Sequence, residues 1–264
     1  MLDVDLVRAA YDEQMRPAEA TGLPPGVYAE SDGLITRIVG QHRGLISAPA
    51  DLLMDGPALD ALIGRQRDFF AARDEPVEWN IRSHDQPADI GQRLRAAGFA
   101  AEETGHLVVG LAQDAVQRDA SMPAEVTIRR TAADDDMRAI AAMETQVWGA
   151  DWDWLADDLT QWSQGDSDQF AVFVAQASGQ VVAAAWMVCK PGTEFAGLWG
   201  GSTLASWRGR GIYRALVACR ARLAVDRGVR YLHVQASSNS RLILERLGFV
   251  AIATTTNYLW SPSS

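Results

Sequence analysis

The stretch "TLASWRGRGIYRAL", residues 203–216, combines a turn rich in glycine and arginine with the start of a predicted helix. Gly209 and Gly211 allow the backbone to turn with its N–H groups pointing inward. The helix expected from Ile212 onward adds a partial positive charge, equivalent to about half an elementary charge. Fixed positive charge comes from three arginines, Arg208, Arg210 and Arg214. Together these features predict a binding site for a pyrophosphate group.

This basic turn belongs to an acidic chain of globular composition. The 264 residues have a formal net charge of -10, with 48% hydrophobic and 22% charged residues. Such a composition is typical of folded proteins, and the length fits one large domain or two of ordinary size. An acidic protein lacks the basic face that phosphate neutralisation requires. We therefore expect no nucleic-acid partner and favour small-molecule partners.

The sequence indicates neither a membrane segment nor a metal site. No apolar run approaches the roughly 20 residues of a membrane helix, and residues 1–20 lack the basic and apolar regions of a signal peptide. The two cysteines, Cys189 and Cys219, suggest a reducing compartment, so we expect a cytoplasmic protein without a disulfide framework. The four histidines are scattered without the Cys/His spacing of a zinc site, so no metal is expected.

The second half of the chain alternates between strand and helix patterns. Strands are predicted within residues 125–131, 170–177, 180–190, 194–205, 229–237 and 249–260. Helices are predicted within residues 134–149, 212–228 and 240–248. This order predicts a mixed, mostly antiparallel sheet with one parallel βαβ crossover and helices on its faces, which is an α/β (α+β) fold.

The first half of the chain contains a weak copy of the second. The sequence "LRAAGFAAEE" (94–103) aligns with "LERLGFVAIA" (244–253), and residues 60–83 align with residues 214–237. The polar segment 112–125 between the two copies is typical of a linker. The predicted organisation is therefore a domain at 1–111, a linker at 112–125 and a domain at 126–264.

In this alignment the basic turn has an acidic counterpart. The sequence Arg208-Gly209-Arg210-Gly211 aligns with Met54-Asp55-Gly56-Pro57. The Asp55 carboxylate would repel a phosphate, and Pro57 has no N–H group to donate. We therefore expect the first domain to lack an anion site and to have a structural or substrate-shaping role.

The element order, the Arg208-x-x-Gly211 turn and the sequence "ILERLGF" (243–249) together resemble the GNAT superfamily of N-acyltransferases. The resemblance covers about residues 126–260 and implies two GNAT-like domains, the first of them degenerate. In this family the turn follows the pattern Gln/Arg-x-x-Gly-x-Gly/Ala and binds the pyrophosphate of acetyl-coenzyme A. Tyr213 departs from the last position of that pattern. The cofactor-binding residues that the resemblance implies are Thr203, Leu204, Ala205, Arg208, Gly209, Arg210, Gly211, Ile212 and Tyr213.

The resemblance also implies direct attack of an amine on the thioester. A backbone N–H group, such as that of Leu204, would stabilise the developing oxyanion. Many family members have a tyrosine four residues before the Gly-Phe pair that protonates the departing thiolate. Leu244 stands at that position here, so no catalytic acid carries over. Usable hydroxyl groups remain at Ser237, Tyr258 and Tyr213, whereas His233 is interpreted as a packed core residue.

The segment "VWGADWDWLADDLTQW" (147–162) contains four tryptophans and four aspartates, in the region that shapes the acceptor pocket in the family. Its indole faces and carboxylates are suited to holding a cationic amine. In the alternative interpretation the aspartates are solvated and the tryptophans fill an interface with the first half.

The resemblance thus implies an N-acetyltransferase that moves an acetyl group from acetyl-coenzyme A to a small-molecule amine. The alternative is a module that binds acyl-coenzyme A without transferring the acyl group, as the missing tyrosine suggests. The sequence leaves the acceptor and the oligomeric state open.

Overall fold

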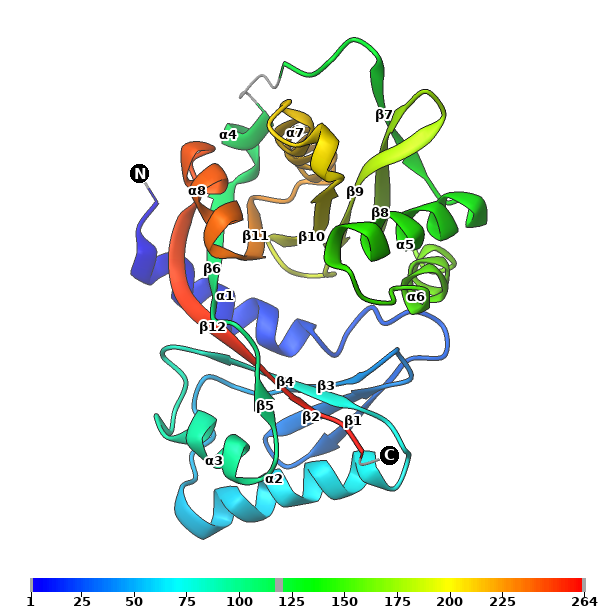
Figure 1. The fold of residues 1–264 in the computed structure, drawn as a ribbon. Helices are drawn as coiled ribbons and strands as arrows, with labels where there is room; N and C mark the ends of the chain where they lie inside the picture. Colours follow the sequence, from blue (N-terminus) through cyan, green and yellow to red (C-terminus); the bar gives the residue numbers. More distant parts are fainter. Residues whose placement is uncertain (1, 117–120, 263–264) are drawn as a thin grey trace.

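The computed structural model describes residues 2–116 and 121–262. One sheet passes through both halves of the chain, and Figure 1 shows it running from an upper lobe into a lower lobe. The first half forms α1 (Val4–Ala18), β1 (Tyr28–Asp32), β2 (Ile35–Val39), β3 (Gly44–Ser47), α2 (Gly56–Ala71), β4 (Val77–Arg82), α3 (Ile90–Ala96), β5 (Ala100–Ala101), β6 (Gly105–Leu111) and α4 (Ala112–Val116). The second half forms β7 (Val126–Thr131), α5 (Asp134–Trp148), α6 (Trp154–Ser163), β8 (Phe170–Ala177), β9 (Gln180–Cys189), β10 (Phe195–Thr203), the 3-10 turn η1 (Ala205–Trp207), α7 (Ile212–Asp226), β11 (Tyr231–Ala236), α8 (Ser238–Arg246) and β12 (Val250–Trp260).

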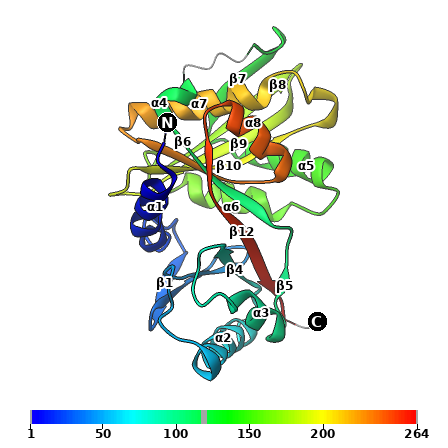
Figure 2. The same cartoon turned by 90° about the vertical axis from the view of Figure 1, so that its left-hand side faces the viewer.

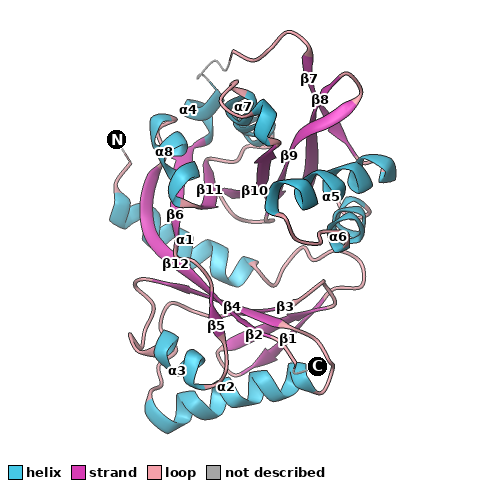
Figure 3. Ribbon diagram, in the orientation of Figure 1, coloured by secondary structure: helices cyan, strands magenta, loops and turns pink. Residues whose placement is uncertain are grey.

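The second half has the predicted mixed sheet. Strands β7, β8, β9 and β10 pair antiparallel in that order, and β10 pairs parallel with β11 after the α7 crossover. Side chains along β8 alternate between the two faces of the sheet. Val172 and Val174 pack with α5 and α6, whereas Phe173 and Ala175 pack with Ile212 of α7. The helices therefore cover both faces, and Figure 3 shows the resulting layers.

The two halves exchange their last strands. Strand β6 of the first half pairs antiparallel with β11 and also with the first part of β12. The second part of β12 pairs with β4, so the strand crosses from one lobe to the other (Figures 1 and 2). Strand pairing therefore joins the two predicted domains, 1–111 and 126–264, which the predicted linker 112–125 separates in the sequence. The division into these domains stays a prediction.

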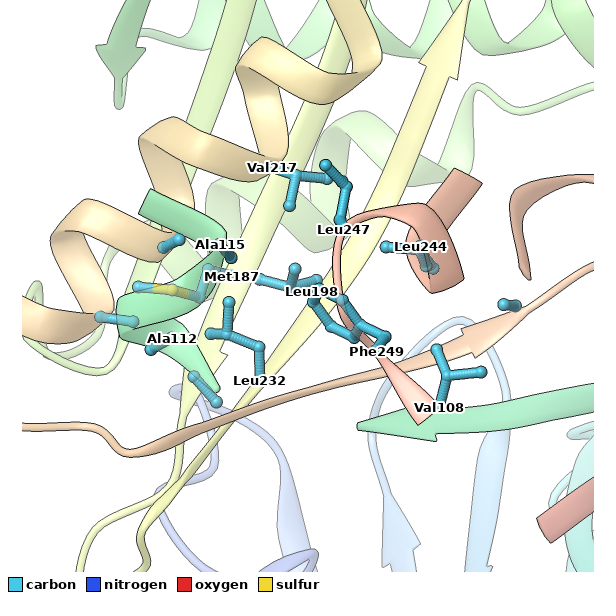
Figure 4. Close-up of a cluster of buried hydrophobic side chains, with 14 of the residues drawn as sticks. Val108, Ala112, Ala115, Met187, Leu198, Val217, Leu232, Leu244, Leu247 and Phe249 are labelled. Atoms are coloured by element: carbon cyan, nitrogen blue, oxygen red, sulfur yellow. The ribbon is translucent and has the colours of Figure 1, made fainter. Parts of the chain in front are cut away.

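Residues 112–116 of the predicted linker form the short helix α4, which packs against α7. Ala112 and Ala115 join a buried cluster with Val217 of α7 and with Leu244 and Phe249 from the end of the chain (Figure 4). Small alanine side chains allow this close approach between the two helices. The buried cluster thus connects α4 to the second half of the chain.

The element order of the first half parallels that of the second. Strands β3 and β4 pair parallel around the α2 crossover, as β10 and β11 do around α7. Leu94 in α3 and Phe99 just after that helix are buried, as are Leu244 in α8 and Phe249 just after it. This parallel supports the predicted duplication.

Candidate active site

The two central parallel strands of the second half diverge. Strand β10 pairs with β11 only over Phe195–Gly197, although β10 continues to Thr203 and β11 to Ala236. The pairing between β10 and β9 also shifts register between Gly200 and Ser202, which marks a β-bulge. The described residues thus contain an open wedge between two strands, with a bulge on one of its edges.

The predicted pyrophosphate turn lies at the open end of this wedge. The Arg208 Nε donates a hydrogen bond to the Thr203 carbonyl oxygen at 3.0 Å, which ties the turn to the end of β10. Gly209 and Gly211 have φ angles of 73° and 83°, a region that favours glycine. Helix α7 begins at Ile212, directly after the turn. The structure therefore brings residues 203–213 together as one continuous surface.

The two turn glycines have different surroundings. A Cβ at Gly209 would meet nothing within 4 Å, so this position faces open space. A Cβ at Gly211 would collide with the backbone carbonyl oxygen of Ser121, so no larger residue fits there without movement. The Arg210 guanidinium lies over the Trp207 ring, 4.9 Å from its centroid, and so is held beside the turn.

The bulge is supported from below by the buried arginine of α7. Arg220 is 2% exposed and donates hydrogen bonds to the carbonyl oxygens of Trp186 at 3.2 Å and Trp199 at 3.1 Å. Burial lowers the pKa of Arg220 to about 10, so the guanidinium stays charged at neutral pH. Tyr213, two turns earlier on the same helix, packs its ring over Gly201 of the bulge. Burial raises the pKa of Tyr213, and the Arg220 charge opposes that rise.

A cleft of about 760 Å³ lies between the two halves and reaches the bulge. Gly200 and Ser202 line it from the second half, and His42, Glu78 and Asn80 line it from the first. Six tryptophans line the cleft, Trp148, Trp152, Trp154, Trp162, Trp186 and Trp199.

Each lobe thus contributes a wall of the cleft. The His42 ring stacks on the Trp154 ring with centroids 4.0 Å apart, which is a direct contact between the halves. Asp158 also lines the cleft, whereas Asp151, Asp153 and Asp157 are exposed. Trp154 thus lies at the interface with the first half and three of the four aspartates are exposed, as the second interpretation of residues 147–162 expects, whereas binding of a cationic amine stays a prediction.

Comparison with known proteins identifies the second half. Residues 134–249 match the model of the acetyltransferase (GNAT) family. The chain contains a GNAT acetyltransferase domain. A sequence comparison with curated proteins found no match.

Solved structures share the fold over both halves of the chain. A GCN5-related N-acetyltransferase from Kribbella flavida has a TM-score of 0.70 and 17% identity, with 95% of each chain covered. A GCN5-related N-acetyltransferase from Sphaerobacter thermophilus has a TM-score of 0.58 and 17% identity, with 98% of this chain and 91% of that chain covered. A tandem GNAT protein from the clavulanic acid biosynthesis pathway has a TM-score of 0.58 and 13% identity, with 100% of this chain and 98% of that chain covered. At these identities the likeness concerns the fold alone.

Glu144 is a buried carboxylate of the GNAT domain that the sequence analysis missed. It is 1% exposed on α5 and lines the cleft. Its Oε2 accepts a hydrogen bond from the Trp148 indole N–H at 2.8 Å, and its Oε1 has no partner in hydrogen-bonding geometry among the described residues. Burial raises the pKa of the Glu144 carboxyl, while the neighbouring polar side chains of Ser202 and Trp148 lower it by favouring the ionised form.

A signal for Glu144 was present in the sequence. Met137, Ile140 and Ala141 form the buried stripe of α5, and Glu144 continues it at the spacing of an apolar position. A carboxylate on such a stripe indicates a functional group or a buried ion pair.

The hydroxyl candidates of the GNAT domain are not all near the wedge. Ser237 follows β11 and caps α8 by accepting a hydrogen bond from the Ser240 backbone N–H at 3.3 Å. Tyr258 is buried in the core of the first half beside Trp79, because β12 crosses into that lobe. Of the three candidates, only Tyr213 contacts the bulge directly.

His233 is a buried, neutral side chain at the start of the wedge. It is 6% exposed, and burial, aided by the charge of Arg82, lowers its pKa to about 3. Its ring packs edge-on against Tyr11 with centroids 5.2 Å apart. In the described part of the chain neither ring nitrogen has a hydrogen-bond partner, and the residue lines the cleft.

In residues 2–116 and 121–262 no group of three or more His, Cys, Asp or Glu side chains is placed to hold a metal ion. Within the same ranges no helix has both the length and the apolar character needed to cross a membrane.

Proposed function

We propose that the protein is an N-acetyltransferase that moves an acetyl group from acetyl-coenzyme A to a small-molecule amine. The observation that carries this proposal is the continuity between the basic turn, the open wedge and the cleft between the halves. The amides near Gly209 and Gly211 would bind the pyrophosphate, and Thr203, Leu204 and Ala205 would lie along the pantetheine arm. The cofactor has room here because β10 and β11 are not paired after Gly197 and because Gly209 faces open space.

The bulge is the proposed site of the thioester carbonyl. The Leu204 N–H was the expected oxyanion donor, but it donates to the Val182 carbonyl oxygen at 2.9 Å. A bulge leaves a residue outside the regular ladder, so the Gly200–Ser202 segment is the better source of a donor. The buried Arg220 charge beneath the bulge favours the negative charge that develops there.

Acetyl transfer needs one proton removed from the amine and one delivered to the sulfur. The acceptor nitrogen forms a bond to the carbonyl carbon, and the carbon–sulfur bond then breaks. We assign proton removal to the Glu144 carboxylate, directly or through a water molecule, because its raised pKa suits a base. Tyr213 is the proposed proton donor to the departing thiolate, since it packs against the bulge.

The first half would shape the acceptor cleft without binding a cofactor. The predicted domain at 1–111 provides His42, Glu78 and Asn80 to the cleft.

The two free cysteines fit the expected reducing compartment.

Turnover separates this function from its alternative, a module that binds acyl-coenzyme A without transfer. The protein is incubated with acetyl-coenzyme A and a panel of amines, while thiol release and the acetyl mass gain of each amine are recorded. The proposal expects at least one amine to exceed the water blank. Acetyl-coenzyme A binding without turnover across the panel would favour the alternative, which the buried Leu244 at the family's acid position supports.

A further inference from the structure

One end of the cleft is acidic and is formed by the first half of the chain. Strand β4 alternates, so that Val77 and Trp79 face the core of the first half, whereas Glu78 and Asn80 line the cleft. Asn257 lies opposite Asn80 on the neighbouring strand and lines the cleft as well. The face of this sheet toward the cleft is therefore polar.

Hydrogen bonds join these polar groups to a further carboxylate. The Asn80 Nδ2 donates to the Asn257 Oδ1, and the Asn257 Nδ2 donates to the Glu102 Oε2 at 3.2 Å. Glu78 pairs with Arg43 at 3.2 Å. Burial raises the pKa of Glu78, and the charges of Glu102 and Glu19 raise it further, against the Arg43 charge. Like charges thus gather at this end of the cleft.

The cations around the cleft are already engaged. Lys190 donates to the Thr21 carbonyl oxygen at 2.8 Å, and burial lowers its pKa to about 8. Arg43 pairs with Glu78. Among the described lining residues the carboxylates are Glu19, Glu78, Glu102, Glu144 and Asp158, against the cations Arg43 and Lys190. Glu19 also pairs with the buried Arg82 at 3.0 Å, so the excess of carboxylates comes from Glu102, Glu144 and Asp158. Negative charge is in excess, so a ligand that fills the cleft gains from carrying positive charge.

The opposite end of the same cleft has buried polar atoms whose hydrogen-bonding capacity is unused. The Glu144 Oε1 and both ring nitrogens of His233 are buried and have no hydrogen-bond partner among the described residues. Both side chains line the cleft beside the bulge. Buried polar groups in this state are costly unless a bound molecule or water satisfies them. Ring contacts lead from Glu144 toward the first half: Trp148, which donates to Glu144, stacks on Trp152, Trp152 packs on Trp154, and Trp154 stacks on His42.

We propose that the acceptor is a small dication, a diamine or a longer polyamine, with its reacting amine beside Glu144 and a second ammonium group between Glu78 and Glu102. This inference rests on the proposed function, because it names the acceptor class of that site. The indole faces contact the methylene chain and the ammonium groups. The first half of the chain then selects the acceptor by recognising the group that does not react.

A matched pair of amines tests the proposal. The kcat/KM for acetylation of 1,5-diaminopentane is compared with those for pentylamine and 5-aminopentan-1-ol, and a series from diaminopropane to spermidine covers other lengths. We expect the best diamine to exceed its monoamine by at least about 10-fold, through a lower KM. Equal use of monoamines and diamines across the series would overturn the proposal.

Two variants locate the second ammonium group. Glu78→Gln and Glu102→Gln should each reduce the ratio of diamine to monoamine kcat/KM by about 10-fold, while the adjacent exposed Glu103→Gln should leave that ratio unchanged. Glu102→Gln serves alone if Glu78→Gln fails to fold, since Glu102 is exposed. A diamine preference that survives in the folded variants would contradict the assignment.

Calorimetry keeps this test separate from the test of acetyl transfer. Diaminopentane and pentylamine are titrated into the full chain without acetyl-coenzyme A. Tighter diamine binding that Glu102→Gln removes supports the dication even if no amine is acetylated, whereas equal binding of the two amines refutes it even if acetylation occurs.

Discussion

The two parallel strand pairs of this protein have the same topology but different ends. In the second half, β10 and β11 separate after Gly197, and a turn of glycines and arginines stands at the opening. In the first half, the chains after β3 and β4 rejoin. The Gln86 N–H donates to the Ala50 carbonyl oxygen at 2.7 Å, and the Leu52 N–H donates to the Gln86 carbonyl oxygen at 3.1 Å. The first wedge is therefore closed by hydrogen bonds.

The helix that follows each wedge shows the same contrast. Helix α2 begins at Gly56, with Asp55 before it and Pro57 inside its first turn. Helix α7 begins beside exposed arginines. An anion at a helix start is bound by backbone N–H groups, by the helix dipole and by basic side chains. In the first half Asp55 stands in place of a basic side chain, and Pro57 has no N–H group. We therefore propose that a few residues at this turn separate a wedge that binds the cofactor from a wedge that is structural.

A second position repeats the contrast inside the crossover helices. Gln66 is buried on α2 and donates to the Leu62 carbonyl oxygen at 3.1 Å, and Arg220 donates to the Leu216 carbonyl oxygen at 3.1 Å on α7. The two residues correspond in the alignment of residues 60–83 with residues 214–237. The first half has a neutral amide where the second half has a cation beneath its bulge.

The largest effect is expected from removing the proposed base, which belongs to the second half. Glu144→Gln should lower kcat by about 100- to 10,000-fold while acetyl-coenzyme A affinity stays within about 2-fold. Asp135→Asn, an exposed change on the same helix, is the control. Steady-state kinetics and calorimetry measure the two quantities, and an unchanged kcat would remove Glu144 from the mechanism.

The pH dependence of kcat and of stability tests the assignment of Glu144 as the base. Burial raises the pKa of Glu144 in the folded protein, so its ionised form destabilises the fold, and this cost appears as pH rises through the raised pKa. A base must be ionised, so kcat should rise over the same pH window. Glu144→Gln should have a melting temperature at pH 8 equal to or above that of the natural protein. A lower melting temperature would indicate that the carboxylate is structurally needed.

The next effect compares the two turns directly. Gly209→Asp should weaken acetyl-coenzyme A binding by about 100-fold relative to Gly209→Asn, since the two side chains have similar shape and only one is charged. Gly56→Asp and Gly56→Asn form the same pair in the first half, where φ is also positive and the space is also open. Binding should not distinguish that second pair. Equal losses of acetyl-coenzyme A affinity at both turns would show that the turn before α7 is not the anion site.

The sequence predicted the position of the turn and the order of elements in the second half, because local spacing and glycine positions determine these features. The correspondence of the two halves stays a prediction, which the parallel order of elements supports. The exchange of β6 and β12 was not predictable, since it depends on pairing between strands far apart in the chain. The same exchange removed Tyr258 from the wedge. The role of Arg220 was not predicted either, because this residue of α7 donates to carbonyl groups of β9 and β10, which precede the helix in the chain.

A smaller effect concerns the cation beneath the bulge. Arg220→Gln copies the first half at this position and should lower the free energy of unfolding by about 2 kcal/mol, because two buried strand carbonyl groups lose their donor. Chemical denaturation measures this change, with the exposed Arg222→Gln on the same helix as the control. Equal stability of the two variants would mean that the strands do not depend on Arg220.

The smallest effect is expected at the exposed arginine of the turn. Arg210→Gln should weaken acetyl-coenzyme A binding by about 3- to 5-fold at low salt, and the difference should shrink as salt screens the charge. Arg67→Gln on α2 is the control from the first half. A loss that is independent of salt would point to a structural role for Arg210 over the Trp207 ring.

A structure of the complex with acetyl-coenzyme A would show whether the wedge of the second half binds the cofactor. We predict that the pyrophosphate contacts the backbone amides of residues 209–213, that the thioester lies at the Gly200–Ser202 bulge, and that nothing binds between β3 and β4. A cofactor bound at the start of α2, or at a surface remote from the wedge between β10 and β11, would show that the site is assigned wrongly.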